Sequence, residues 1–328
     1  MEIDTDKIPL NYLDLRLGNK CNLACRSCGP TESSLWLKNY SKEQTSIPWY
    51  GVKEYNLKHN KGKVTLDTDE FNWAYNTNFL EQILDNSKDI NRFYFTGGEP
   101  TINIPHIEFL EKLVEKGIAK NIYLEYNSNG MGMPDRLLNI WPKFKGTGIG
   151  FSIDGLENKF EYLRYPGKWK AFINTLSKLH KNISNFHNLD VCLSPTVSIY
   201  NFIHILDMYK FIFSEVPPWF SKFLSLQVLQ GPDWMSYKIM PDDSKEKIRN
   251  IYKNWIENID KIERLNVSTY DKSKFKANCI RMLNNILKFL DNEIPNQEEL
   301  LQTFYIETDK QDKLYNQNFK ETFPEILP

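Results

Sequence analysis

The sequence has no long hydrophobic run, no excess of charge of one sign and no internal repeat. No stretch approaches the roughly 20 consecutive apolar residues that span a bilayer, and the acidic first ten residues lack the apolar core of a signal peptide. The 41 basic and 42 acidic residues give a formal net charge of -1, so no global field favours a nucleic acid or a membrane, although a local basic patch remains open. We therefore expect a cytoplasmic protein with no membrane contact and no clear nucleic-acid surface.

Cysteine is also scarce: the chain has five, and three of them lie within eight residues. A disulfide framework normally spreads its cysteines through a small secreted domain, whereas clustered thiols indicate metal or redox chemistry. What the 328 residues do provide is a core, because 41% of them are hydrophobic and 14% aromatic. That is enough for one large globular domain, with or without an appendage.

Short apolar or β-branched segments alternate with helical patterns along the first two thirds of the chain. The predicted strands are residues 13–17, 92–96, 121–126, 148–153, 189–197 and 223–229. Such alternation favours an α/β fold with a parallel sheet and helices outside it. A partial barrel of six strands and a doubly wound open sheet both fit this pattern.

After about residue 240 the strand pattern stops. Apolar stripes at helical spacing over residues 248–259 and 275–290 predict a helical C-terminal extension, so we divide the chain into 1–235 and 236–328. Residues 41–72 are polar and irregular and longer than an ordinary connection. We expect them to be an insertion over the mouth of the sheet, where it could act as a lid.

The first predicted strand runs directly into Cys21, Cys25 and Cys28, a CxxxCxxC spacing. A structural zinc site normally takes four ligands, and the nearest other candidate along the sequence is His59. Three thiolates suit a four-iron, four-sulfur cluster whose fourth iron is left open. A zinc loop completed by a distant histidine or by Cys279 remains the alternative.

Polar and glycine-rich motifs follow the next three predicted strands. The second strand ends in Gly97-Gly98-Glu99, where the glycines let the backbone approach a ligand and the carboxylate offers an acceptor to an ammonium group. The third strand ends in Asn-Ser-Asn-Gly at 127–130 and the fourth in Ser-Ile-Asp-Gly at 152–155. Ligands of barrels and open parallel sheets collect at these carboxyl ends.

The cysteine spacing after a first strand, followed by these motifs in this order, resembles the radical S-adenosylmethionine (SAM) superfamily and, within it, the SPASM and twitch branch. The resemblance covers residues 13 to about 230 and implies a partial (βα)6 TIM-like barrel with a C-terminal helical extension. It also implies a four-iron, four-sulfur cluster on Cys21, Cys25 and Cys28. One departure is Ser27, where the family usually has an aromatic residue.

The resemblance further implies how SAM is held at the strand ends. The Gly-Gly-Glu motif holds the methionyl amino group, and residues after the fourth strand, with a following arginine, contact the ribose hydroxyls and the methionyl carboxylate. On the fifth strand a small polar face alternates with an apolar one, and we expect it to line the lumen. The predicted SAM-binding set is Gly97, Gly98, Glu99, Asn127, Asn129, Ser152, Asp154, Arg164 and Ser194.

The implied activity is reductive cleavage of SAM to a 5'-deoxyadenosyl radical that abstracts hydrogen from a second substrate, with an electron donor such as flavodoxin or ferredoxin. The branch points to a peptide or protein side chain as that substrate. A nucleotide or another small molecule is the alternative within the class, and a basic, aromatic-lined pocket would favour it. A zinc- or cluster-stabilised binding protein is the alternative outside it. Only Cys192 and Cys279 remain outside the first loop, too few for the auxiliary clusters common in the branch.

Overall fold

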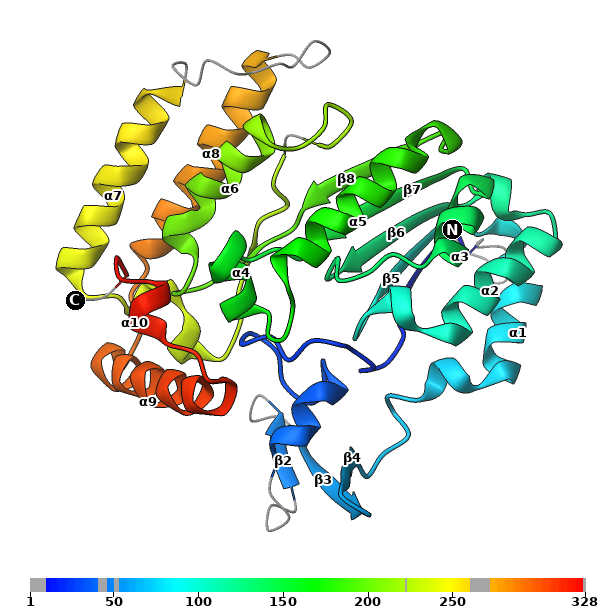
Figure 1. Cartoon of the computed structure of the whole chain (residues 1–328), viewed down its shortest axis with the longest axis horizontal. Coiled ribbons are helices and arrows are strands. Elements are labelled where there is room, and N and C mark those ends of the chain that lie inside the picture. Colours follow the sequence, from blue (N-terminus) through cyan, green and yellow to red (C-terminus); the bar gives the residue numbers. More distant parts are fainter. Residues whose placement is uncertain (1–9, 41–45, 50–52, 222, 260–271, 327–328) are drawn as a thin grey trace, which may run out of the picture. The chain divides into compact units, whose positions relative to one another are not determined.

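The computed structural model (Figure 1) describes residues 10–40, 46–49, 53–221, 223–259 and 272–326. The chain forms two compact units that interleave along the sequence. The first unit comprises Met1–Ala24, Cys28–Phe151 and Lys170–Val191. The second comprises Cys25–Ser27, Ser152–Trp169 and Cys192–Pro328. The predicted division between residues 235 and 236 stays a prediction.

A parallel sheet with the strand order β1-β5-β6-β7-β8 forms the framework of the fold. Its strands are β1 (Tyr12–Arg16), β5 (Arg92–Thr96), β6 (Tyr123–Ser128), β7 (Gly146–Phe151) and β8 (Leu189–Leu193). The register places Leu15 beside Phe95 and Phe95 beside Tyr126. Figure 1 shows β5, β6 and β7 as neighbouring arrows. Five of the predicted strands therefore lie in one sheet.

The two faces of this sheet differ, as the two-residue period of a strand requires. Phe93, Phe95 and Leu124 are fully buried, and Phe93 meets the ring of Phe109 from a covering helix edge-on at 5.4 Å. The residues between them, such as Tyr94, form the opposite, polar face. The helices before and between these strands are α1 (Thr77–Asp85), α2 (Ile104–Glu115), α3 (Asp135–Ile140), α4 (Glu157–Leu163) and α5 (Trp169–Asn182).

The sixth predicted strand pairs within the second unit. β9 (Thr196–Val197) is parallel to β10 (Gln227–Val228), and Leu193 forms a parallel bridge with Leu224. Pro195 has no backbone N–H, and the predicted strand 189–197 is interrupted there. The predicted α/β fold, a partial barrel of parallel strands, is confirmed.

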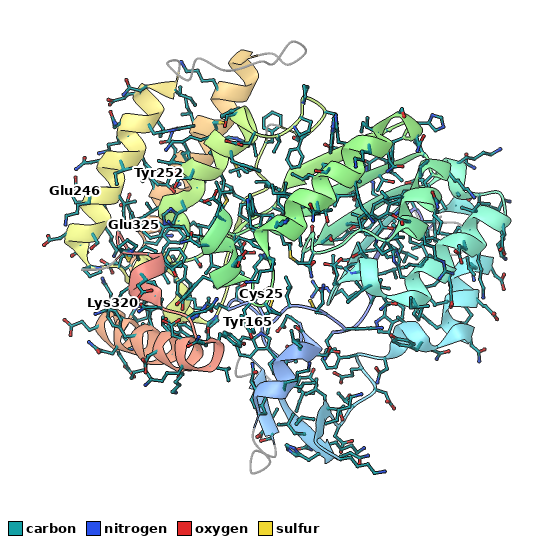
Figure 2. The ribbon with its side chains drawn as sticks, in the orientation of Figure 1. Cys25, Tyr165, Glu246, Tyr252, Lys320 and Glu325 are labelled. Atoms are coloured by element: carbon teal, nitrogen blue, oxygen red, sulfur yellow. The ribbon has the colours of Figure 1, made fainter. Side chains whose placement is uncertain are left out.

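The described residues after 240 are mainly helical, as predicted. Its helices are α7 (Asp242–Glu257), α8 (Lys272–Leu290), α9 (Gln297–Tyr315) and α10 (Phe319–Thr322), preceded by α6 (Ile205–Ser214). α7 and α8 lie side by side in Figure 1, and Figure 2 shows the buried Tyr252 of α7 pointing inward and Glu246 pointing outward. We did not predict α9, which buries only Phe304, Thr308 and Tyr315 and so lacks a wide apolar stripe.

The prediction of an irregular segment at 41–72 is wrong where the structure describes it. β2 (Ser46–Trp49), β3 (Lys53–Asn60) and β4 (Lys63–Leu66) form an antiparallel sheet in the order β2-β3-β4. Lys61 and Gly62, with φ of 46° and 80°, make the two-residue loop between β3 and β4. This loop type needs positive φ at both positions, and a glycine supplies one of them. The glycine was the signal we missed, and residues 41–45 and 50–52 lie outside the described residues.

Candidate functional site

The Gly97-Gly98 turn packs against the backbone that leads to Cys21. Leu17 N donates to Thr96 O at 2.9 Å, and Glu99 N donates to Lys20 O at 2.9 Å. Gly98 has a φ of +55°, and a Cβ there would lie 2.3 Å from Lys20 O. We had assigned the glycines to the approach of a ligand. In the structure they are needed first for the approach of the chain's own cysteine loop.

Glu99 connects the end of β5 to the end of β6. The residue is 1% exposed. Its Oε1 accepts hydrogen bonds from Thr101 N at 3.1 Å, from Thr101 Oγ1 at 2.7 Å and from Ser128 Oγ at 2.9 Å. Its Oε2 accepts a hydrogen bond from Asn129 N at 2.6 Å. Burial raises the pKa of Glu99, and the hydrogen bonds from Asn129, Thr101 and Ser128 oppose that rise. Three of the four hydrogen bonds reach Oε1 and one reaches Oε2, so Oε2 keeps one acceptor site. Glu99 therefore positions these strand ends, and its contact with an ammonium group stays a prediction.

Asn129 joins the end of β6 to the cysteine loop. Its Nδ2 donates to Asn22 Oδ1 at 2.8 Å and lies 3.8 Å from Cys21 Sγ, which also accepts from Leu23 N at 3.5 Å. Hydrogen bonds to sulfur stabilise the charge of a thiolate and tune an iron–sulfur cluster. The structure thus brings together Cys21, Asn129 and Glu99, three of the predicted site residues of the first unit.

Two other predicted residues of this unit have different surroundings. Asn127 is exposed and donates through Nδ2 to Tyr94 Oη at 2.7 Å, on the polar face of the sheet. Cys28 is half-buried and precedes a turn in which Gly29 N donates to Glu32 Oε2 at 2.9 Å. Their roles stay predictions.

In the second unit, Cys25 lies beside Arg164. The thiol is 4% exposed, and Arg164 Nη1 donates to its sulfur at 3.7 Å. Arg164 Nη2 also pairs with Asp154 Oδ2 at 2.8 Å, and Asp154 Oδ1 accepts from Thr196 N at 2.8 Å. A neighbouring guanidinium favours the thiolate form of cysteine. The structure therefore groups the predicted Cys25, Asp154 and Arg164, while the contacts of the last two with SAM stay predictions.

Two further members of the predicted set lie in the second unit. Ser152 is half-buried in the segment that follows β7. Ser194 is 8% exposed, and its Oγ donates to Ser225 O at 3.2 Å. This bond links the end of β8 to the segment that leads into β10, so the observed contact of Ser194 is structural.

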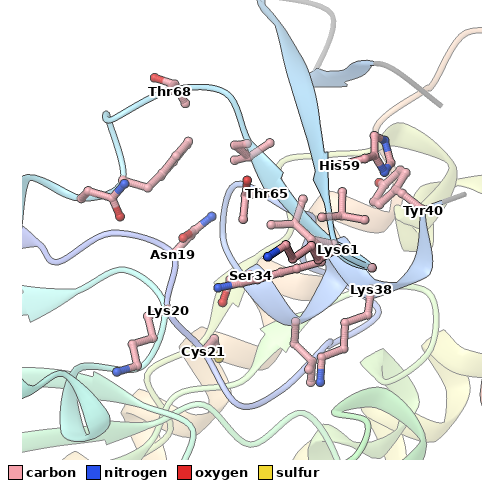
Figure 3. Close-up of a pocket in the computed structure, with 18 of the residues that line it drawn as sticks. Asn19, Lys20, Cys21, Ser34, Lys38, Tyr40, His59, Lys61, Thr65 and Thr68 are labelled. Atoms are coloured by element: carbon pink, nitrogen blue, oxygen red, sulfur yellow. The ribbon is translucent and has the colours of Figure 1, made fainter. Parts of the chain in front are cut away.

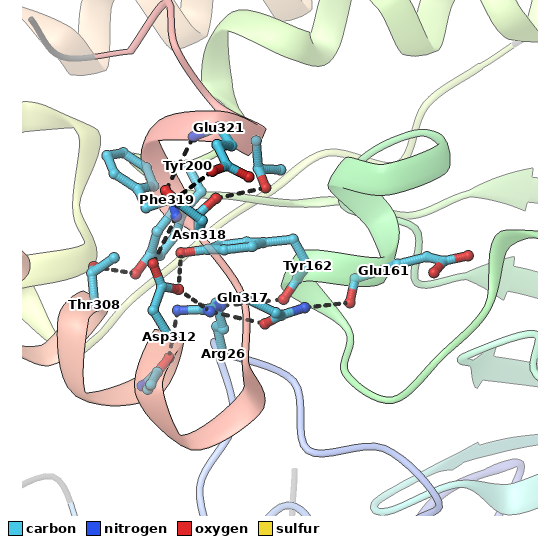
Figure 4. A network of polar contacts seen from close by, with 12 residues as sticks. Arg26, Glu161, Tyr162, Tyr200, Thr308, Asp312, Gln317, Asn318, Phe319 and Glu321 are labelled. Atoms are coloured by element: carbon cyan, nitrogen blue, oxygen red, sulfur yellow. Dashed lines mark hydrogen bonds and ion pairs between the residues drawn. The ribbon is translucent and has the colours of Figure 1, made fainter.

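Sequence reasoning missed Arg26, which follows Cys25 and lies at the centre of a polar network (Figure 4). Its guanidinium is fully buried and lies 3.6 Å from the ring centre of Tyr162. Arg26 Nη2 donates to Asp312 Oδ1 at 2.6 Å and to Gln317 Oε1 at 2.9 Å. Asp312 Oδ1 also accepts from Tyr162 Oη at 2.7 Å. Nothing in the sequence beyond the arginine itself indicates this network, because its partner Asp312 follows 286 residues later.

Residues between 59 and 72 line part of a large pocket in the first unit, with a volume of about 1350 Å³. Its walls come from the Cys21 segment, from a 3-10 helix at Ser34–Asn39 and from β3 and β4 (Figure 3). Lys20, Lys38, Lys61 and Lys63 line it together with Cys21, and none of the described residues in its lining is an aspartate or glutamate. We name this the lysine-lined pocket. It is the local basic patch that the neutral overall charge left open.

Cys21 and Cys25 have surroundings that suit thiolate ligands. Both sulfurs accept hydrogen bonds, and none of the five cysteines is in a disulfide. Within the described residues no three side chains of His, Cys, Asp or Glu are grouped as a metal site, so the ligand set rests on the sequence spacing. Burial raises the pKa of Cys279, the distant ligand of the zinc alternative, to about 12, which keeps this thiol protonated.

The comparisons with known proteins identify the class. The model of the radical SAM superfamily matches residues 15–212, more than half of the chain. The chain therefore belongs to the radical SAM superfamily, whose enzymes use a four-iron, four-sulfur cluster and SAM. No curated protein matches. None of the helices in the described residues is long and apolar enough to cross a membrane.

Solved structures of radical SAM enzymes are among the matches. anSMEcpe with bound AdoMet is 20% identical, with a TM-score of 0.47, over 76% of this chain and 61% of that one. SuiB of Streptococcus suis bound to S-adenosylmethionine is 14% identical, with a TM-score of 0.41, over 77% and 45%. SuiB bound to precursor peptide SuiA is 14% identical, with a TM-score of 0.40, and the match covers 77% of this chain and 47% of that one. The chain thus spans about six-tenths or less of the length of these proteins.

Proposed function

We propose that this chain is a radical SAM enzyme whose cluster is held by Cys21, Cys25 and Cys28. The observation that carries the proposal is the CxxxCxxC loop, in which the sulfurs of Cys21 and Cys25 each accept hydrogen bonds within their own unit. The three thiols lie within eight residues, so the length of the loop alone keeps them within reach of one cluster.

Cys21, Cys25 and Cys28 would hold the cluster, and the cluster would supply the electron for reductive cleavage of SAM, the source of the radical that would take hydrogen from the second substrate. The chain's own residues bind and orient. Asn129 and Arg164 donate to sulfur, Glu99 fixes the strand ends, and the burial of Cys25 excludes water from its thiol. The rest of the predicted SAM-binding set belongs to this proposal. An electron donor such as flavodoxin or ferredoxin and a cytoplasmic location, where thiols stay reduced, complete it.

The second substrate that we favour is a peptide or protein side chain. The pocket beside Cys21 exceeds the roughly 300–1,000 Å³ that small ligands occupy, which supports a longer substrate. A nucleotide or another small anionic molecule is the second candidate. It is favoured by the four lysines and by Tyr40, Phe71 and Tyr75 in the same lining.

The test is anaerobic reconstitution with iron and sulfide, followed by dithionite and SAM, with iron counted and 5'-deoxyadenosine measured by mass spectrometry. We expect about four irons per chain and formation of 5'-deoxyadenosine. Cys21→Ala, Cys25→Ala and Cys28→Ala should lose both, whereas the control Cys192→Ala, outside the loop, should keep both. One zinc per chain with no iron would instead support the zinc-stabilised binding protein.

A further inference from the structure

β4 has a free edge. Within the described residues it pairs with β3 alone, in a register that places Asn60 opposite Lys63. The pair that flanks a two-residue hairpin loop is hydrogen-bonded, and such pairs alternate along the ladder. Lys63 therefore directs its N–H and C=O towards β3, whereas Val64 and Leu66 direct theirs away from it. Asp67, two residues after Thr65, again faces β3, because its N–H donates to Asn56 O of β3 at 2.8 Å.

This free edge belongs to the lysine-lined pocket. All four residues of β4 line the pocket, and Val64, Thr65 and Leu66 are only half-buried. An exposed strand edge is a template on which an extended peptide can add a further strand. Four residues of strand match about 13 Å of extended chain, at about 3.3 Å per residue.

The charge of the pocket selects the kind of peptide. Lys20, Lys38, Lys61 and Lys63 are exposed, and within the described residues they make no ion pair. Lys58 of β3, which is not in the lining, pairs with Asp67 at 2.5 Å. The chain thus neutralises the lysine outside the pocket and leaves those in the pocket available to carboxylates.

We propose that the lysine-lined pocket binds an acidic, extended segment of the substrate peptide, which pairs with the free edge of β4. Cys21 lines the same pocket, so a peptide held there reaches the cysteine loop. The inference rests on the proposed function and names its substrate class. Backbone pairing supplies affinity without regard to side chains, and the lysines select for acidic residues.

The experiment measures binding of a fluorescent peptide of alternating glutamate and valine to the reconstituted full chain, by anisotropy at low salt. A matched peptide of alternating lysine and valine should not bind. The double variant Lys61→Glu, Lys63→Glu should weaken binding of the acidic peptide at least tenfold, whereas Lys88→Glu, an exposed lysine of the same unit outside the pocket, should leave it within twofold.

The contribution of the backbone is tested separately. Val64→Pro removes an N–H that faces the free edge of β4 and leaves every N–H that pairs with β3. We therefore expect the variant to fold and peptide binding to fall at least fivefold. Val64→Thr keeps the N–H and should bind like the wild type. Circular dichroism verifies the fold of each variant.

Two results would overturn the inference. One is equal binding of the acidic peptide to the pocket variants and the wild type. The other is binding of ATP with the same dependence on Lys61 and Lys63 while Val64→Pro has no effect on the peptide, which would assign the pocket to small phosphorylated molecules. Cluster content and 5'-deoxyadenosine are measured on the same wild-type sample. Peptide binding without bound iron would mean that the proposed function fails. Bound iron with equal peptide binding to the wild type and the pocket variants would mean that this inference fails.

Discussion

The Arg26 network and the lysine-lined pocket are both rich in charge, and both include residues next to a cysteine of the loop. The Arg26 guanidinium is fully buried, with hydrogen-bond partners in Asp312, Gln317 and Tyr162 (Figure 4). The lysines of the pocket are exposed, and the described residues of the lining include no carboxylate (Figure 3). The first arrangement has its counter-charge within the chain, and in the second the described lining residues include four lysines and no carboxylate.

This difference separates stability from recognition. A buried charge is tolerated only when the fold supplies its counter-charge and hydrogen bonds, so its loss should appear in the free energy of unfolding. An exposed charge contributes little to the free energy of unfolding, so the lysines of the pocket can be used for ligand binding without loss of stability. Substitutions can test the stabilising role of the Arg26 network and the binding role of the lysine-lined pocket independently.

The largest effect should come from Arg26. Arg26→Met leaves the largely buried carboxylate of Asp312 without its counter-charge, and we expect the free energy of unfolding to fall by about 3–5 kcal/mol. The control is Arg249→Met, whose arginine pairs with the exposed Asp291 at 2.6 Å and should cost about 1 kcal/mol or less. Urea denaturation measures both, and equal losses would contradict the comparison.

The next effect concerns the close approach of the Gly-Gly turn to the cysteine loop. Gly98→Ala adds a Cβ 2.3 Å from Lys20 O at a positive φ, and the combined cost should be about 3 kcal/mol. Gly62→Ala shares the positive φ but has nothing within 4 Å of the new Cβ, so about 1 kcal/mol is expected. A Gly98→Ala protein as stable as Gly62→Ala would show that the turn is not tightly packed.

A smaller, pH-dependent effect should arise at His106. Burial lowers the pKa of this histidine to about 3, so it is neutral in the folded chain and protonates in the unfolded chain below about pH 6.5. Its contribution to stability is complete above pH 6.5 and is lost as the pH falls towards 3. Urea denaturation at pH 7.5 and 5 should show a loss of about 2 kcal/mol from this group.

The control for the histidine is His106→Gln, which retains polar atoms for Tyr126 Oη and Pro100 O and has no titration in this range. Between pH 7.5 and 5 the free energy of unfolding of this variant should change less than that of the wild type. The difference should equal the amount assigned to His106. An identical pH dependence in the variant and the wild type would refute the assignment.

The smallest effect on stability should come from the pocket. Lys61→Gln combined with Lys63→Gln should change the free energy of unfolding by no more than about 0.5 kcal/mol, because both side chains are exposed. Binding of the acidic peptide should nevertheless weaken, and in the wild type it should fall as salt is raised. A loss of stability comparable to that of Arg26→Met would mean that these lysines belong to the architecture.

Much of the fold could be predicted because its signals are local. The strand β5 was predicted with its exact bounds, since Phe93 and Phe95 alternate with polar neighbours, and the helix α8 follows from an apolar stripe that includes Leu283 and Leu290. β2, β3 and β4 were missed because β3 is mostly polar, β2 contains Pro48, and β2 and β4 have only four residues each. α9 was missed because its few buried residues are too widely spaced to form a stripe.

The candidate site was predicted as a set of residues but not as a set of contacts. The spacing identified Cys21 and Glu99 as members, and the structure joins them through Asn129. That Glu99 also accepts hydrogen bonds from Ser128 and Asn129 was not predictable, because these donors are set by how β5 and β6 pair. The same holds for the lysine-lined pocket, whose lysines are scattered along the sequence.

The sequence by itself determined the alternation of strands and helices, the cysteine loop and the order of the motifs, since each depends on residues a few positions apart. Only the tertiary structure decided which polar groups are satisfied within the chain and which face a pocket without partners. The physical reason is that burial and counter-charge depend on neighbours in space: Arg26 finds its carboxylate in Asp312 at the far end of the chain, whereas Lys63 has none in the pocket that it lines.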